Sequence, residues 1–221
     1  MKLITATRGA WFAGLLLLAQ PVLAAEVAYT LEPGHTETRF NWTHLGFSHP
    51  GAGFDDITGS LRWNAADLRK SSVTVDIAVA SIHTHVPLLD KILLSHKYFD
   101  AVRYPKITFV STRVESTRQA NHFRVVGNLT VHGITKPVVL DVTRNQTGSY
   151  PMFNIPAMGF DASTHFKRSD FGLGEGVPYV SDEIRVRITT EALEAESLAK
   201  AKPAMDAMAA KAAQEAQSEQ P

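Results

Sequence analysis

The chain of 221 residues carries 22 lysine and arginine residues against 22 aspartate and glutamate residues, and it contains no cysteine. Because these charges balance, the chain has no net positive charge that would attract nucleic acid. No clustered basic run with interleaved aromatic residues is present either, so we expect no nucleic-acid partner. A local basic patch remains compatible with a neutral total. Without disulfides, the fold must rest on a proper hydrophobic core.

The first 24 residues have the layout of a secretory signal peptide. Lys2 and Arg8 form a positive start, residues 11–19 an apolar core, and Val22-Leu23-Ala24 a small-residue cleavage site. The apolar run is well short of the roughly 20 residues that a membrane-spanning helix needs. We therefore expect a cleaved signal peptide, residues 1–24, and a mature protein that is periplasmic or secreted.

Alternating apolar residues, which are typical of strands with one buried face, recur through the mature region. The alternating runs are Thr38 to Trp42, Ile57 to Trp63, Val73 to Val79, Ile107 to Phe109, Met158 to Phe166 and Ile184 to Ile188. Their opposite faces are polar, as in an antiparallel sheet with one solvated face. About eight strands without a long covering helix must form a sandwich or close into a barrel, and a barrel of this size is either filled by side chains or holds one small ligand.

A β-hairpin is predicted around His132-Gly133. Apolar residues at spacings of two or multiples of two stand on both sides of it: Phe123, Val125, Leu129 and Val131 before the turn, and Val138, Leu140 and Val142 after it. Gly133 supplies the permissive turn dihedral. Because Pro137 lacks an amide donor, the second strand should lie at an edge or enter the sheet only beyond this residue.

Residues 87–97 break the strand rhythm and predict a short amphipathic helix. Apolar residues recur at helical spacing, with Asp90 early and Lys97 late, where their charges suit the helix dipole. Such a helix would either cover one end of a barrel or simply connect two strands.

The last residues differ in composition from the rest of the chain. After Glu194, alanine, lysine, glutamate and glutamine dominate, and Pro203 interrupts the run. We interpret residues 196–221 as a polar tail, partly helical or disordered, outside a single domain of residues 25–195. A partner-binding helix is the alternative, although few bulky apolar residues are present to drive association.

The clearest candidate for metal chemistry is His83-Thr84-His85. The spacing places two imidazoles on one face of a strand, and His44, His49 or His96 would complete a site. No carboxylate cluster or established ligand spacing frames the pair, so a histidine-based metal protein or enzyme is an alternative and not the leading hypothesis.

Catalytic patterns are weak throughout the chain. Ser48-His49, Ser95-His96 and Thr164-His165 are neighbours only in sequence, and no Gly-x-Ser-x-Gly elbow is present. The glycine-rich residues 172–176 follow no parallel strand, which argues for a surface loop. We therefore expect a protein that is not an enzyme, with no catalytic residues, no metal site and no cofactor.

Four separated stretches carry a resemblance to a known family. They are His44 to Ser48; Ser95 to Asp100 together with Tyr104 to Phe109; the hairpin of Gly127 to Val138; and Arg168 to Gly172. In this order and spacing, over residues 26 to about 195, they resemble the YceI family of exported, lipocalin-like polyisoprenoid-binding proteins. The resemblance implies an all-β antiparallel barrel of about eight strands, with the short helix near its mouth and an apolar lumen.

The resemblance also implies site residues. The lumen lining that we expect is Phe40, Trp42, Phe54, Ile77, Leu93, Phe109, Leu129, Leu140, Phe160 and Phe171, and the candidates for head-group contact at the mouth are His44, Asp90 and Arg168. Family members often carry Arg-Asp-x-His-Leu where this chain has Leu89 to Leu93. Two polar side chains have become aliphatic, which makes a more apolar ligand conceivable.

The sequence thus indicates an exported protein that sequesters or carries a polyisoprenoid or other long-chain amphiphile, such as a fatty-acyl lipid, with transient membrane contact. The second alternative, besides the metal protein, is a filled barrel that acts as a structural or partner-binding module.

Overall fold

The computed structural model describes residues 26–218, and the predicted signal peptide of residues 1–24 lies outside them. The strands are β1 (Val27–Leu31), β2 (Glu37–Asn41), β3 (Gly51–Phe54), β4 (Ile57–Trp63), β5 (Ser72–Ala78), β6 (Ile82–His83), β7 (Lys106–Ser116), β8 (His122–Val131), β9 (Ile134–Tyr150), β10 (Ile155–Lys167) and β11 (Glu183–Glu194). The helices are α1 (Pro87–Leu94) and α2 (Ala195–Ser218), with short 3-10 turns η1 (Pro33–His35), η2 (Leu68–Lys70), η3 (Val79–Ser81) and η4 (Arg168–Phe171).

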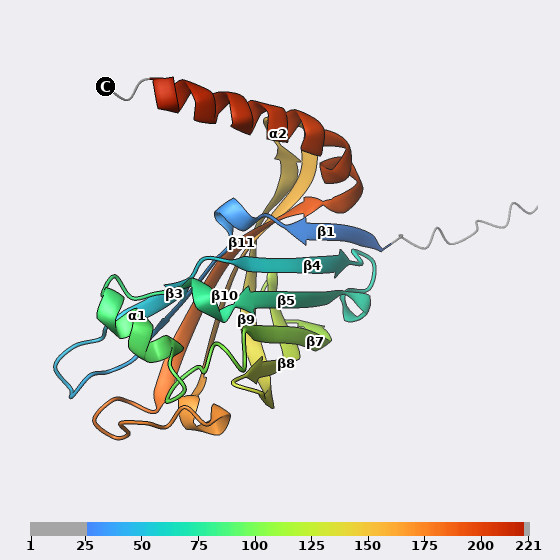
Figure 1. The fold of residues 1–221 in the computed structure, drawn as a ribbon. Coiled ribbons are helices and arrows are strands. Elements are labelled where there is room, and N and C mark those ends of the chain that lie inside the picture. Colours follow the sequence, from blue (N-terminus) through green and yellow to red (C-terminus); the bar gives the residue numbers. More distant parts are fainter. Residues whose placement is uncertain (1–25, 219–221) are drawn as a thin grey trace, which may run out of the picture.

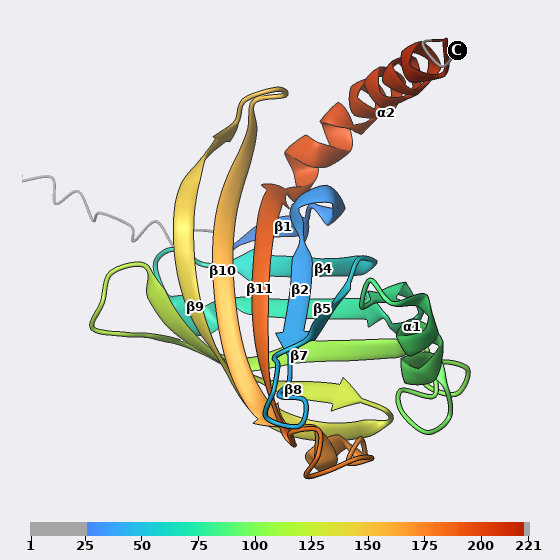
Figure 2. The same ribbon diagram turned by 90° about the vertical axis from the view of Figure 1, so that its left-hand side faces the viewer.

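Eight of the strands close into an antiparallel barrel (Figure 1, Figure 2). Their order is β1-β4-β5-β7-β8-β9-β10-β11, and β11 returns to β1 through the pairs Tyr29 with Glu194 and Leu31 with Ala192. Closure gives every strand of this ring two neighbouring strands. The predicted closed barrel of about eight strands is confirmed.

The three remaining strands branch from β11. Residues Ala192 to Glu194 of β11 pair with β1, whereas Arg185 to Thr189 of the same strand pair with β2. The turn η1 carries the chain from one branch to the other, and β2 then continues the sheet to β3 and β6. Figure 2 shows β2 alongside β11. The branch therefore forms a small flap that adjoins the barrel.

The hairpin of β8 and β9 turns at His132 and Gly133, whose φ angles of 51° and 73° are both left-handed, as a tight two-residue turn requires. Pro137 pairs with Asn128 of β8, and β9 gains its second neighbour, β10, only from Asp141 onward. β9 is an interior strand, but the part of it that contains Pro137 pairs with β8 alone. A residue without an N–H donor is tolerated there, because no second strand needs that hydrogen bond.

Helix α1 begins at Pro87 as predicted but ends at Leu94, before the predicted end at Lys97. The reason is local. Ser95 has extended backbone, and both its backbone N–H and its hydroxyl donate to the carbonyl of Ile92, the hydroxyl at 2.6 Å. These bonds close the last turn, so the chain leaves the helix at Ser95.

The described part of the tail is the helix α2, which includes Pro203 and has no buried residue. It touches the strands β1, β10 and β11 and then projects from the barrel (Figure 2). Ion pairs one turn apart, such as Glu196 with Lys200 at 2.6 Å, are typical of a solvated helix. Among the described residues, no helix combines the length and the apolar character needed to cross a membrane.

Candidate functional site: an apolar cavity inside the barrel

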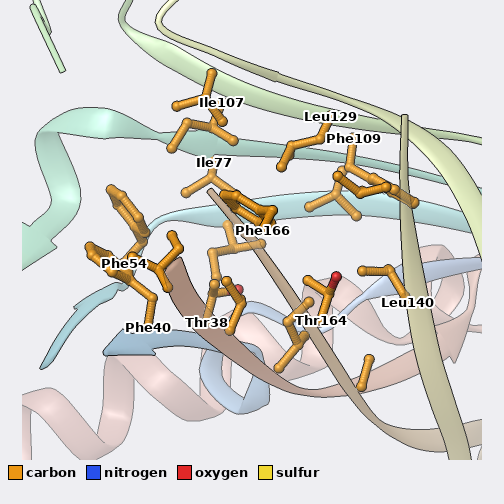
Figure 3. A pocket seen from close by; sticks show the side chains of 18 of the residues that line it. Thr38, Phe40, Phe54, Ile77, Ile107, Phe109, Leu129, Leu140, Thr164 and Phe166 are labelled. Atoms are coloured by element: carbon orange, nitrogen blue, oxygen red, sulfur yellow. The ribbon is translucent and has the colours of Figure 1, made fainter. Parts of the chain in front are cut away.

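The barrel encloses an apolar cavity of about 670 Å³, seen from close by in Figure 3. Its wall is built from strands all round the barrel, from β2 and β3 of the flap and from α1. Small-molecule sites in proteins are typically apolar spaces of about 300–1,000 Å³. A barrel filled by its own side chains would have no such space, which argues against the filled-barrel alternative.

The structure places all ten predicted lumen residues on the wall of this cavity. They are Phe40, Trp42, Phe54, Ile77, Leu93, Phe109, Leu129, Leu140, Phe160 and Phe171. Their contact with a ligand stays a prediction.

The cavity exists because short side chains line one wall. Thr38, Ala162 and Thr164 face it from β2 and β10, and the register joins them across β11: Ala162 pairs with Ile188, which pairs with Thr38. Ile77, Phe109 and Leu129 stand on the other side, as Figure 3 shows for Thr38 and Thr164 against these three. Long side chains on both walls would meet in the middle and exclude a ligand.

Aromatic rings gather where the flap meets the barrel. The ring of Phe40 is stacked on that of Phe54 with centroids 5.7 Å apart, and Phe99 meets Phe54 edge-on at 5.8 Å. Trp42 lies 5.9 Å from Phe40, and Leu93 of α1 also lines this part of the wall. Such offset and edge-on packing is the favoured geometry for aromatic pairs, so these rings form a firm apolar wall.

Of the three residues predicted at the mouth, His44 borders the cavity from the loop between β2 and β3. Its backbone N–H donates to the carbonyl of Ser48 at 2.9 Å, and the residue also forms a bridge with Val180. His44 and Ser48 are both exposed and both on the wall, so the cavity reaches the surface here.

Asp90 does not line the cavity but holds α1 in place. Its carboxylate accepts hydrogen bonds from the backbone N–H of Thr84 at 2.7 Å and from the Thr84 hydroxyl at 2.6 Å. Thr84 is buried just beyond β6. Since both bonds engage one carboxylate oxygen within the protein, the geometry favours a structural role over head-group contact.

Arg168 lines the cavity, yet its guanidinium is committed to the backbone. It is buried, and it donates to the carbonyls of Ser181 at 2.9 Å, Glu175 at 2.9 Å and Val180 at 3.0 Å, and also to that of Leu173. These bonds fasten the loop between η4 and β11. The planar guanidinium is suited to several fixed acceptors at once, so Arg168 acts as a clamp for this loop.

The predicted histidine pair is not part of the cavity. His83 and His85 have ring centroids 5.3 Å apart, and Nδ1 of His83 is 3.0 Å from Oδ2 of Asp55, on the outer face of the flap. In residues 26–218, the group of three metal-type donors that comes together is instead Glu32, His35 and Glu191.

This second group behaves as an ion-pair cluster. Nδ1 of His35 lies 2.6 Å from Oε2 of Glu32 and 3.7 Å from Oε2 of Glu191. The hydrogen bond to Glu32 is the largest effect and raises the pKa of His35. Burial lowers this pKa by less than the hydrogen bond raises it, and the negative charges of Glu191 and Glu32 raise it further. The cluster joins η1 to β11 at the point where the sheet branches.

Sequence reasoning missed several wall residues. Leu61 and Trp63 of β4 and Phe123 of β8 lie at alternating positions that were already recognised, so the same pattern could have identified them. Thr38 and Thr164 are polar, so their residue type does not indicate that they face inward. Only their spacing of two residues from Phe40 and Phe166 on the same strands does so.

Comparison with known proteins bears on this geometry. A family model described as a YceI-like domain matches residues 29–192. A UPF0312 protein of Pseudomonas putida (strain GB-1) is 35% identical over 176 residues, which cover 80% of this chain and 90% of that relative.

Among solved structures, Burkholderia cenocepacia BcnA has a TM-score of 0.66 at 23% identity, over 73% of this chain and 98% of BcnA. A polyisoprenoid-binding domain from Saccharophagus degradans, implicated in plant cell wall breakdown, has a TM-score of 0.56 at 16% identity, over 76% of this chain and 99% of that domain. Both structures show the same fold, and the domain match together with the Pseudomonas relative shows that this chain belongs to the YceI-like family.

Proposed function

We propose that the protein is an exported carrier that holds the hydrocarbon part of a polyisoprenoid or another long-chain amphiphile inside its barrel. The observation that carries the proposal is the cavity of about 670 Å³ with its apolar wall, which reaches the surface beside His44. The structurally similar Saccharophagus degradans domain, described as polyisoprenoid-binding, supports the same class of ligand.

The ligand class follows from what the wall offers. Side chains that face the interior are mainly aliphatic or aromatic, and the uncharged polar residues among them are hydroxyl residues such as Thr38 and Thr164. Such a wall desolvates hydrocarbon without a charged anchor. The head group should therefore stay at the mouth near His44, because Asp90 and Arg168 are engaged within the protein.

The expected affinity suits carriage and release. Larger ligands gain about 0.3 kcal/mol per heavy atom, so a chain of about 20 atoms gains roughly 6 kcal/mol, which corresponds to a Kd on the order of tens of micromolar. Binding of this strength is reversible. Export through the amino-terminal signal would place the carrier where membrane lipids are handled, in the periplasm or outside the cell.

Solvent extraction of the purified protein followed by mass spectrometry tests the proposal. Protein recovered from a lipid-containing host should release a long-chain lipid in less than stoichiometric amount, because part of a ligand of this affinity dissociates during purification. Delipidated protein should take up a fluorescent fatty-acyl probe that the extracted lipid displaces. Absence of both extractable lipid and probe uptake would overturn the proposal.

A further inference from the structure

We propose that the mouth of the barrel docks on the surface of an anionic lipid bilayer; this rests on the proposed function and names where the carrier exchanges its ligand. Four strongly exposed apolar side chains come from the loops that carry His44 and Val180, from α1 and from the segment that follows α1: Phe47 at 90% exposure, Tyr179 at 71%, Leu88 at 69% and Val102 at 97%. Large apolar side chains exposed together in this way mark an interaction surface. We call these four residues the apolar rim.

The first two segments of the apolar rim are tied together at the mouth. Phe47 lies in the loop between β2 and β3, and Tyr179 lies in the loop between η4 and β11. The backbone N–H of Leu45 donates to the carbonyl of Tyr179 at 2.8 Å. Figure 2 shows the two loops side by side at the lower end of the barrel, away from α2. His44 and Val180 in the same loops line the cavity, so this part of the rim borders its opening.

Helix α1 supplies the third segment and is apolar on two sides. Leu89 and Leu93, one turn apart, line the cavity, whereas Leu88 and Ile92, also one turn apart, are 69% and 41% exposed. A surface helix normally turns a polar side to water. An outer side with Leu88 and Ile92 suits the interfacial region of a bilayer, where amphipathic helices bury such residues.

Charge around α1 favours anionic head groups. Lys91, Lys97 and Arg103 have no carboxylate within 4.0 Å in the part of the chain that the structure describes. The acidic residues of the same segment are Asp90 and Asp100, so the three cations outnumber the carboxylates by one. This local basic excess next to apolar side chains is the combination that binds anionic membranes.

The position of the rim selects a bilayer over a protein partner. Its residues come from separate loops and a helix around an opening, and a protein seated on them would close the route into the cavity. A bilayer surface would instead bring the mouth to a source of hydrocarbon. A hydrocarbon chain that leaves the membrane would then pass directly onto the apolar wall of the cavity, to which Trp42 and Leu89 belong.

Vesicle flotation with the full mature chain tests the docking. The wild type should float with vesicles of phosphatidylcholine mixed with phosphatidylglycerol, and less with phosphatidylcholine alone. The double variant Phe47→Ser, Leu88→Ser should reduce the floated fraction about tenfold, and the triple variant Lys91→Glu, Lys97→Glu, Arg103→Glu should remove the preference for phosphatidylglycerol. Met152→Ser is the matched control, because Met152 is 61% exposed in the turn between β9 and β10, far from the mouth.

Two readouts separate this inference from the function on which it rests. Circular dichroism establishes that each variant is folded, and mass spectrometry of extracted lipid reports the carrier activity independently of docking. A folded wild type that contains lipid but floats with neither vesicle would overturn the docking alone. Equal flotation of the wild type, the double variant and the triple variant would overturn it as well.

Discussion

Gly127 lies so close to the ring of Phe109 that a Cβ added to the glycine would stand 2.4 Å from Cζ of Phe109. Gly127 of β8 pairs with Ser111 of β7, and Phe109 lies two residues from Ser111 on the same face of β7. Phe109 is one of the large side chains on the cavity wall. The missing side chain of one strand therefore sets the position of a ring on the next. Small residues shape the cavity as much as large ones do.

Gly127→Ala should destabilise the fold and alter the cavity. The added methyl group also meets the backbone carbonyl of Val110 at 2.7 Å, so Phe109 must move from its rotamer. Overpacking of this kind costs about 1–3 kcal/mol, which urea unfolding measures. Gly148→Ala is the control, since the atom that its added Cβ would meet, Nε2 of Gln146, is 3.6 Å away. An equal loss in both variants would contradict the packing argument.

Ala162→Trp should fill the cavity and abolish lipid binding. Ala162 faces the interior from β10, between Val142 and Ile188 in the register, where space depends on its small size. The large ring should compete with the ligand for the same volume. Probe uptake by the folded variant checks this. Ser163→Trp, on the outer face of the same strand, should bind the probe as the wild type does.

Arg168→Lys should lower the free energy of unfolding by about 2–5 kcal/mol, because an ammonium cannot reach the four carbonyls that the guanidinium serves. Carbonyls of the loop between η4 and β11, that of Leu173 buried and the other three partly buried, would lose their donors. Thermal or urea unfolding gives the magnitude, and Arg118→Lys on the exposed loop between β7 and β8 is the reference. A loss as small as that of the reference would show that the clamp contributes little.

Asp90→Ala should loosen α1, since it removes the acceptor of both Thr84 bonds. Hydrogen bonds to a charged group contribute about 1.5–3 kcal/mol. We expect a loss in that range together with faster amide hydrogen exchange in α1. Lys91→Ala, which changes an exposed position of the same helix, should leave both quantities near their wild-type values.

The pH dependence of stability should carry a contribution from His35. The hydrogen bond to Glu32 raises the pKa of His35 above its unfolded value, so its stabilising effect is full below a pH of about 6.5 and is lost as pH rises through the folded pKa. The effect should be small because the side chain is 57% exposed. Unfolding of His35→Gln and of Glu32→Gln across this window should show a flatter profile than the wild type. A profile unchanged in both variants would contradict the assignment.

Several elements could be predicted from neighbouring residues alone. The strands β2, β4, β5 and β7 to β11 follow from alternation, because the pleat repeats every two residues and one face is buried. The turn at His132-Gly133 follows from its own dihedral preference. In contrast, β1, β3 and β6 were missed, since β3 reads Gly-Ala-Gly-Phe and β6 has two residues, which is too little sequence for a period.

The internal hydrogen bonds of Asp90 and Arg168 show what charge alone leaves open. Both are polar residues near the mouth, which suggested head-group contact. Their partners, however, are the Thr84 hydroxyl and loop carbonyls that only the folded backbone brings within reach. The sequence shows that a residue is charged. Which donors or acceptors form hydrogen bonds with it depends on the positions of those groups in the folded protein.

By itself, the sequence determined about eight antiparallel strands, the hairpin, the helix and the residues that share the apolar face, because these depend on periodicities within one strand or turn. Periodicity left a sandwich and a barrel open, and the barrel was implied by the resemblance to the YceI family. Only the tertiary structure decided that the barrel is hollow. That outcome depends on side-chain volumes summed across strands far apart in the chain, with Thr38, Ala162 and Thr164 on one wall and Phe109 and Leu129 on the other.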